Sequence, residues 1–272
     1  MQVSNYTEEG NVLVVDSAVA GFCTYQKNKF TASDHVEKLI PKGKFNKYIA
    51  LFLTMQINKN NFSKFSYGYK ASPIRLRRSK IMLPTNGNGK PDFEYMEKYI
   101  LIQEEKKKQE YICYCKNNLK KLGNAIPLYS LAEIEWSPFY IDEIFKIDSG
   151  KRLESYNMTS GKRPFIGATD SGNGMAISFY HPYECIFSDD VKCFHLKEYP
   201  DNKYVLLFFK AIILQQKPKY NYGYKFNGTR MKRQIIMLPV NDAGNPDYEY
   251  MEQYIKNLMI KKYNAYLEYA EK

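Results

Sequence analysis

The chain has 272 residues, of which 44% are hydrophobic and 15% aromatic, so it can bury one or two cores and does not resemble a disordered protein. A net charge of +11 fits a polyanionic partner, although basic proteins without such a partner are common. The five cysteines lack disulfide or zinc spacing, the first ten residues are polar and acidic, and no apolar run approaches the ~20 residues of a membrane span. These features favour a reduced, cytoplasmic protein and argue against a secreted disulfide scaffold or a membrane protein.

The sequence is internally duplicated. The twenty residues of Ile81–Ile100 return at Ile236–Ile255 with 14 identical positions, an offset of 155. The same offset relates Tyr67–Lys70 to Tyr222–Lys225, and it slips to 156 where Lys47-Tyr48-Ile49 matches Lys203-Tyr204-Val205. Because so long a period occurs only twice, it predicts two similar domains rather than a solenoid. We expect a first domain in residues 1–90, a long helix in 91–123, a second domain in 124–245 and a second long helix in 246–272.

In chain order, residues 11–80 are expected to form mainly strands. The β-branched run Val12–Val19 and the segment Gly21–Tyr25 predict strands, and Ser33–Val36 predicts a turn before a short strand. The run Lys47–Ile57 fits a buried strand or a helix, and we favour the helix because its apolar residues recur at a spacing of four.

Two basic segments follow in matched positions. Lys70–Lys80 contains five basic residues and no acid, and Lys225–Arg233 contains four basic residues and no acid. A solvated loop is the simpler interpretation, but the charge recurs where the intervening residues differ, so we favour phosphate binding. The candidate phosphate-binding residues here are Lys70, Arg75, Arg77, Arg78, Lys80, Lys225, Arg230, Lys232 and Arg233. The preceding tyrosines, Tyr67 and Tyr222, are expected to be core residues, with stacking near a groove as the alternative, and Gly68 and Gly223 to permit tight turns.

Each copy ends in a long helical pattern. Pro91 and Pro246 suit the first helical position, and acidic residues follow in the first turn. Helices over 91–122 and 246–272 would be ~48 and ~40 Å long, more than one domain needs for its core. We therefore expect the two helices to pack on each other, the alternative being that each folds back on its own domain. The predicted pairing residues are Met96, Ile100, Met251, Ile255 and Leu258.

Residues 124–170 precede the second copy and have no counterpart before the first, which is therefore shortened at its N-terminal side. This segment contains Trp136, the run Gly150–Leu153 and the run Gly161–Asp170. Together with the repeated blocks, it resembles the target-recognition domains of DNA specificity subunits from type I restriction-modification systems and their relatives. The resemblance spans nearly the whole chain, and Lys162 and Arg163 of this segment join the candidate DNA-binding residues.

The resemblance implies an α+β fold with two homologous β-rich target-recognition domains, each followed by a long helix, the two helices pairing as an antiparallel coiled coil. It also implies that each domain reads half of a split double-stranded DNA site and directs methyltransferase and restriction subunits to that site. Self-association through the helices is a further expectation. The alternative is a shortened chain that serves as a protein-interaction scaffold and binds methyltransferase without full DNA recognition.

Several apparent catalytic motifs do not withstand comparison between the copies. Asn245–Tyr248 resembles the Asn-Pro-Pro-Tyr motif of adenine methyltransferases, but its partner is Lys90–Phe93 and no Gly-rich cofactor loop precedes it. The histidines His35, His181 and His195 show no paired ligand or nucleophile spacing. We therefore expect a non-catalytic binding protein without a cofactor or metal.

Overall fold

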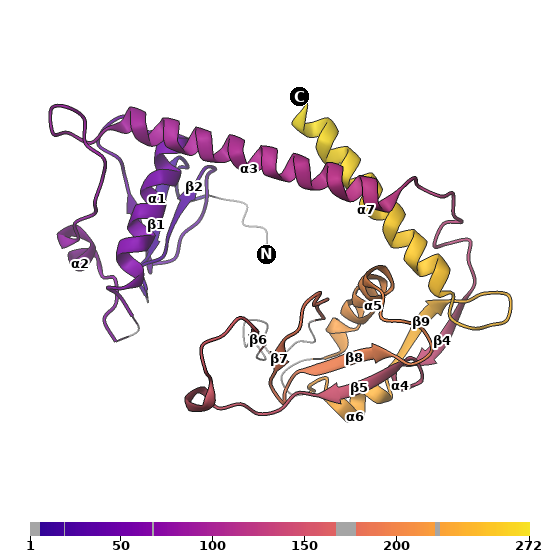
Figure 1. Cartoon of the computed structure of the whole chain (residues 1–272). Coiled ribbons are helices and arrows are strands. Elements are labelled where there is room, and N and C mark those ends of the chain that lie inside the picture. The colour runs from indigo at the N-terminus through magenta and orange to yellow at the C-terminus, as the bar shows by residue number, and fades with distance from the viewer. Residues whose placement is uncertain (1–5, 19, 67, 167–177, 221–223) are drawn as a thin grey trace. The chain divides into compact units, whose positions relative to one another are not determined.

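The computed structural model describes the chain except for residues 1–5, 19, 67, 167–177 and 221–223 (Figure 1). It divides into two compact units, Met1–Cys113 and Tyr114–Lys272. Both units combine helices with strands, which agrees with the α+β expectation. Within the described part of the chain, no helix is both long and apolar enough to cross a membrane.

The first unit is built on a three-stranded antiparallel sheet with β1 (Val12–Asp16) between β2 (Cys23–Gln26) and β3 (Val36–Leu39). Its helices are α1 (Lys47–Phe62), α2 (Pro73–Arg78) and the first part of α3 (Phe93–Leu122). The apolar residues of β1 and β2 pack against α1, which forms the core of this unit. The strands expected at the start of this unit and the choice of helix for α1 are confirmed, but residues 11–80 are not mainly strands, because α1 and α2 cover more of them than β1, β2 and β3 do.

The described residues of the second unit form three two-stranded sheets. These pair β4 (Trp136–Tyr140) with β9 (Ile235–Pro239), β5 (Phe145–Ser149) with β8 (Lys192–Leu196), and β6 (Phe165–Ile166) with β7 (Ile186–Phe187). Its helices are α4 (Ile141–Ile144), α5 (Lys203–Gln215), α6 (Gly228–Lys232) and α7 (Tyr248–Ala270), with 3₁₀ turns η1 (Ser155–Asn157) and η2 (Lys217–Lys219). The core lies between α5, α7 and the strands, where the rings of Phe145 and Phe209 meet edge-on with centroids 4.7 Å apart.

The duplication extends to individual hydrogen bonds. The Asn46 side chain accepts hydrogen bonds from the first turn of α1, and its Nδ2 donates to Glu97 on α3 at 2.8 Å. Asn202 caps α5 in the same way, and its Nδ2 donates to Glu252 on α7 at 2.6 Å. One side chain in each copy thus ends one helix and fixes it to another, because an Asn at this position satisfies free backbone N–H groups.

The turns before α3 and α7 are also matched. Gly89 and Gly244 adopt positive φ angles of 71° and 78°, which other residues rarely adopt. The carboxylates of Asp92 and Asp247 then accept a hydrogen bond from the backbone N–H three residues later, at 2.9 Å in both copies. The helices therefore begin after these aspartates, rather than at the prolines that the sequence suggested, because the aspartates occupy the capping position.

The residues expected to pair the two long helices are largely used within their own units. Met251 and Ile255 belong to the core of the second unit, and Met96 is fully buried. Ile100 is half-buried and Leu258 is exposed. For Met251 and Ile255, as for the other pairing residues, contact with the other long helix stays a prediction, because helical spacing predicts an apolar stripe without specifying which surface covers it. The early turns of α7 pack on α5.

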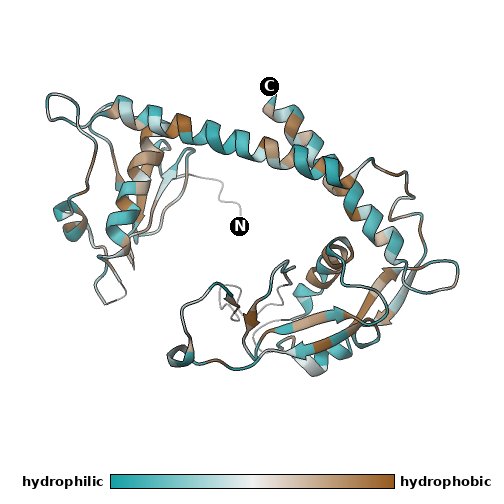
Figure 2. Cartoon of the chain, in the orientation of Figure 1, coloured by the Kyte–Doolittle hydropathy of each residue, from teal (hydrophilic) through white to brown (hydrophobic). Residues whose placement is uncertain are grey.

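The later turns of α7 contact the end of α3 within the second unit. The rings of Tyr114 and Tyr263 meet edge-on with centroids 6.0 Å apart, and the neighbouring Cys115 is fully buried. Figure 2 shows that hydrophilic residues predominate along the middle of α3. A coiled coil along the two helices stays a prediction.

Candidate nucleic-acid interface

Each basic segment contains a short helix, where the sequence suggested a loop. Pro73 starts α2, a position at which its missing N–H and fixed φ favour a helix. In the second copy, the Asn227 side chain accepts a hydrogen bond from the Arg230 backbone N–H at 3.0 Å and caps α6. The basic residues are therefore presented from two ordered helical turns.

The first arginine of each helix is held in place. The Arg75 guanidinium lies 4.0 Å from the centroid of the Tyr69 ring, and its Nη1 donates to the Lys70 carbonyl at 2.8 Å. In the second copy, Arg230 lies 3.9 Å from the Tyr224 ring and donates to the Lys225 carbonyl at 2.8 Å. Both guanidinium groups combine a cation–π contact with a backbone hydrogen bond, so they position the basic helix.

A second aromatic ring lies beneath each tyrosine. Phe65 is buried and stacks on Tyr69 with centroids 6.0 Å apart, and Tyr220 is buried and stacks on Tyr224 at 5.7 Å. Burial raises the pKa of the Tyr220 phenol, whose hydroxyl donates a hydrogen bond to Oε1 of Gln234 at 2.6 Å. We name each arrangement of buried ring, tyrosine and arginine a Tyr–Arg stack. It connects the basic helix to the interior of its unit.

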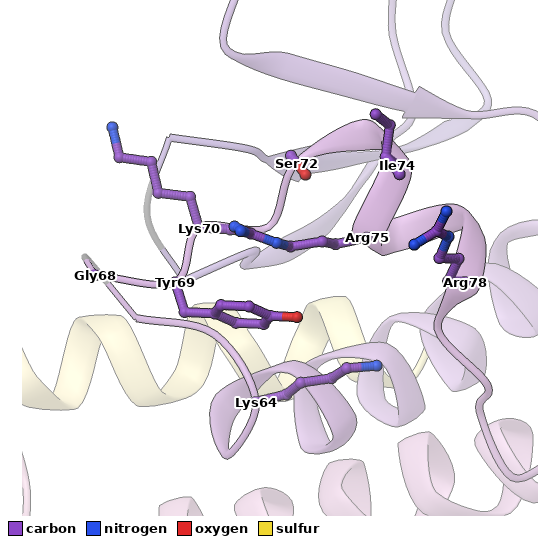
Figure 3. Close-up of a pocket in the computed structure, with 8 residues that line it drawn as sticks. All are labelled: Lys64, Gly68, Tyr69, Lys70, Ser72, Ile74, Arg75 and Arg78. Atoms are coloured by element: carbon purple, nitrogen blue, oxygen red, sulfur yellow. The ribbon is translucent and has the colours of Figure 1, made fainter.

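A lysine completes each arrangement. Lys64 donates to the Ser79 hydroxyl at 2.9 Å, and its counterpart Lys219 donates to the side-chain oxygen of Gln234 at 3.0 Å. In the first unit, Lys64 and the Tyr–Arg stack border an open pocket of about 680 Å³ (Figure 3). Its lining residues are Lys64, Gly68, Tyr69, Lys70, Ser72, Ile74, Arg75 and Arg78. Three of the side chains drawn in Figure 3, those of Lys64, Lys70 and Arg78, add positive charge beside the Tyr–Arg stack.

The other basic side chains of these segments are exposed. Arg77 and Arg78 follow Arg75 on α2 and make no ion pair with any of the described residues. Their counterparts Lys232 and Arg233 are also exposed, and Lys232 lies 3.7 Å from the carboxylate of Asp142. Exposed Lys70, Lys80 and Lys225 extend the same basic segments. This arrangement provides cationic groups that can neutralise phosphates without first breaking a buried contact.

Lys162 and Arg163 lie apart from these helices in the chain, in the segment before β6. Both are exposed, and Arg163 forms an ion pair with Glu184 at 2.5 Å. No hydrogen bond or ion pair within the described ranges connects them to α6. Their assignment to a DNA surface therefore stays a prediction.

Sequence reasoning missed the tyrosines that form the stacks. It selected Tyr67, Tyr222 and Gly223, which lie outside the described residues, whereas the matched contacts involve Tyr69 and Tyr224. The signal was present, because an arginine follows each of these tyrosines by six residues in both copies. Spacing shared between repeats was a better guide than the conspicuous Tyr-Gly-Tyr motif.

The structure also brings together a cluster that the sequence did not indicate. Cys193 Sγ lies 3.3 Å from Nε2 of His195, and Nδ1 of His195 lies 2.6 Å from Asp201. Burial raises the pKa of the Cys193 thiol, which disfavours the thiolate that a nucleophile requires. The other oxygen of Asp201 accepts a hydrogen bond from the Leu196 N–H at 2.9 Å, so the cluster ends strand β8. In the part of the chain that the structure describes, no group of three or more His, Cys, Asp or Glu residues could hold a metal ion.

A family model and a known protein that are similar to this chain indicate the same family. Residues 2–112 and 174–269 match the type I restriction modification DNA specificity domain. The type II restriction enzyme BgcI specificity subunit S.BcgI from Heyndrickxia coagulans is 42% identical over 257 residues, which are 86% of this chain and 73% of that protein.

Solved structures of S subunits are also similar to this chain. The type I restriction-modification S subunit from M. genitalium gives a TM-score of 0.39 at 13% identity, over 99% of this chain and 81% of that one. The HsdS subunit from Thermoanaerobacter tengcongensis gives 0.33 at 11% identity, over 97% and 77%. The two matched segments and the 42% identical relative show that this chain belongs to the family of type I restriction-modification DNA specificity domains and is a non-catalytic specificity subunit of a restriction-modification system.

Proposed function

We propose that the chain binds double-stranded DNA through α2 and α6, each domain reading one half of a split target site. The observation that carries this proposal is the repeated Tyr–Arg stack, which holds a basic helix in the same way in both copies. A duplicated device that orders exposed cations fits a ligand that itself repeats charge at a fixed spacing, as duplex DNA does.

Within each basic helix, the exposed residues contact the DNA. Arg77 and Arg78 in the first domain, and Lys232 and Arg233 in the second, neutralise phosphates, and an arginine among them reaches guanine edges. Lys70, Lys80 and Lys225 widen the cationic surface. Arg75 and Arg230 contribute indirectly, because their guanidinium groups already bind a tyrosine ring and a carbonyl.

The proposal extends to the assembly. The bound subunit directs methyltransferase subunits, and with them the restriction subunit, to the target site in the cytoplasm, where the cell's DNA lies. The long helices provide the docking surface and fix the distance between the two half-sites, and the same helices allow self-association. The polar residues Glu104 to Glu110 of α3, all exposed except the half-buried Lys108, suit a protein partner of this kind.

Selection from random duplex pools tests the proposal. The chain is incubated with the pool alone and with purified methyltransferase subunits, and bound duplexes are sequenced. We expect enrichment of a bipartite sequence with a fixed spacer. A pool that remains random under both conditions, while the chain still binds methyltransferase, would contradict DNA recognition.

That contrary result would support the second candidate, an interaction scaffold that binds methyltransferase without full DNA recognition. One observation supports this second candidate. The apolar segment 81–84 of the first unit does not form a strand, whereas its counterpart in the second unit does. Enrichment of only one half-site would assign recognition to the second domain alone.

A further inference from the structure

The tetrapeptide Ile-Met-Leu-Pro occurs twice and has two different environments. In the second unit, residues 236–239 lie in β9 and pair with β4 in an antiparallel register that places Met237 opposite Pro138. In the first unit, residues 81–84 form no strand, and Ile81, Met82 and Leu83 make no backbone hydrogen bond to any described residue. The same four residues therefore pair with a strand in the second copy and have no partner strand among the described residues of the first.

The burial of these apolar side chains also differs between the two copies. Ile236 and Leu238 are 1% and 0% exposed in the second unit, whereas Ile81 and Leu83 are only half-buried. Met82 is 86% exposed, against 46% for Met237. An apolar segment with free N–H and C=O groups is a template for another strand.

Two positions on the adjoining helices extend this comparison. In the second unit, the Tyr250 hydroxyl donates to the Tyr129 carbonyl at 2.9 Å, and Asn257 binds both the N–H and the C=O of Ile126, at 3.1 and 2.6 Å. Residues 126–140 therefore lie against both β9 and α7.

The counterparts of Tyr250 and Asn257 on α3 are uncovered. Tyr95 is 51% exposed, against 8% for Tyr250, and Ile102, at the position of Asn257, is 64% exposed. Tyr95 and Ile102 thus occupy the positions on α3 that correspond to the contacts of residues 126–140 with α7 in the second unit.

We propose that segment 81–84, together with Tyr95 and Ile102 of α3, binds an extended polypeptide segment with the sequence character of residues 126–140, supplied by a partner protein. The occupant pairs antiparallel with 81–84, so its backbone provides the hydrogen bonds and its apolar side chains cover Ile81 and Leu83. The Tyr95 hydroxyl donates a hydrogen bond to a backbone carbonyl of the occupant. Ile102 replaces Asn257, so at that end the occupant presents an apolar side chain.

A synthetic peptide of residues 126–149 tests the proposal on the full chain. Peptide binding is followed by fluorescence anisotropy, and amide hydrogen exchange is measured with and without saturating peptide. We expect saturable binding and exchange slowed about tenfold or more at Met82 and Leu83. The amides of β9, already paired with β4, should not change.

Two variants of α3 make the test specific. Ile102→Asp places a charge within the proposed surface and should weaken peptide binding about tenfold or more. Leu101→Asp adds the same charge one residue away. The counterpart of Leu101 is Lys256, whose ion pair is with Glu252 and not with residues 126–140, so this control should bind as the parent does. Both positions are exposed, so neither change should unfold the unit.

Three outcomes would overturn the proposal. The first is that the peptide does not bind, and the second is that it protects β9 rather than Met82 and Leu83, which would mean exchange with β4. Protection of Met82 and Leu83 in a dimer of the chain alone would assign the edge to a second copy.

Discussion

Arginines of one basic segment differ in role because of their surroundings. Arg75 binds the Tyr69 ring and the Lys70 carbonyl, whereas Arg77 and Arg78 project from the same short helix without an ion pair in the described part of the chain. The recurrence of charge between the copies predicted the segments. The recurrence of charge could not distinguish Arg75, which binds a tyrosine ring, from Arg77 and Arg78, which bind no ring among the described residues. That distinction depends on Tyr69, which the intervening turn brings close to Arg75.

We expect Arg77→Ala/Arg78→Ala to reduce the salt dependence of DNA binding. Each phosphate contact removed lowers the slope of log K against log salt by about one. The measurement is fluorescence anisotropy on the selected duplex at several salt concentrations. A weakened complex with an unchanged slope would mean that these arginines do not contact phosphates.

Arg75→Lys provides the contrasting case. Lysine keeps the charge but lacks the planar guanidinium that meets the ring and the carbonyl together, so α2 should lose its orientation. We expect weaker DNA binding with a nearly unchanged salt slope, and Arg230→Lys should act likewise in the second domain. Unchanged DNA affinity in both lysine variants would mean that the guanidinium is not needed to orient these helices.

Glu97 gives a pH-dependent prediction. A hydrogen bond from Lys44 lowers the pKa of its carboxyl below the unfolded value. Its stabilising contribution is therefore present above the unfolded pKa of about 4.3 and is lost as the pH falls through the lower folded value. The melting temperature of Glu97→Gln should be lower than that of the parent near pH 7, and the two melting temperatures should converge as the pH falls through the lowered folded pKa. A constant difference across this range would remove the ionic explanation.

At the scale of elements, the long helices were predicted better than their contacts. Their extents follow from the helical pattern and the capping aspartates, and α3 and α7 begin within two residues of the expected positions. The surface that covers each stripe was not predictable from one helix alone. Phe52 meets Tyr99 edge-on with centroids 5.6 Å apart, and Phe208 meets Tyr254 at 5.9 Å, so each helix first packs on its own unit.

Ile255→Asp should therefore destabilise the second domain rather than only separate the helices. Ile255 is 8% exposed within the core around α5, and an unpaired charge there costs several kcal/mol. Leu258→Asp, one turn away at a position 40% exposed, is the matched control and should change stability little. Urea unfolding followed by tyrosine and tryptophan fluorescence measures both. Equal effects would contradict the assignment of Ile255 to the core.

For the whole molecule, the duplication predicted two similar domains, and the structure divides into two compact units, Met1–Cys113 and Tyr114–Lys272, whose boundary lies within α3. The main difference between the copies could not be predicted from the repeated residues. Residues 81–84 and 236–239 are identical in sequence, yet only the second set has a partner strand, because that strand comes from residues that precede the repeat. Identical local sequence does not fix burial when the covering element lies outside it.

The helix α3 runs without interruption from Phe93 to Leu122, so its length should set the spacer between half-sites under the proposed function. Inserting four alanines in its polar middle, between Lys107 and Lys108, adds ~6 Å at ~1.5 Å per residue. At ~3.4 Å per base pair, the selected spacer should lengthen by about two base pairs while both half-site sequences stay the same.

Selection from random duplex pools with the inserted chain measures this directly. The control carries the same four residues after Lys272, where they lengthen no connection between the domains, and should select the original spacer. An unchanged spacer in the chain lengthened within α3 would mean that this helix does not set the distance between the two recognition surfaces. Changed half-site sequences would instead indicate that the insertion disturbs the basic helices, because α2 and α6, rather than α3, are proposed to contact the bases.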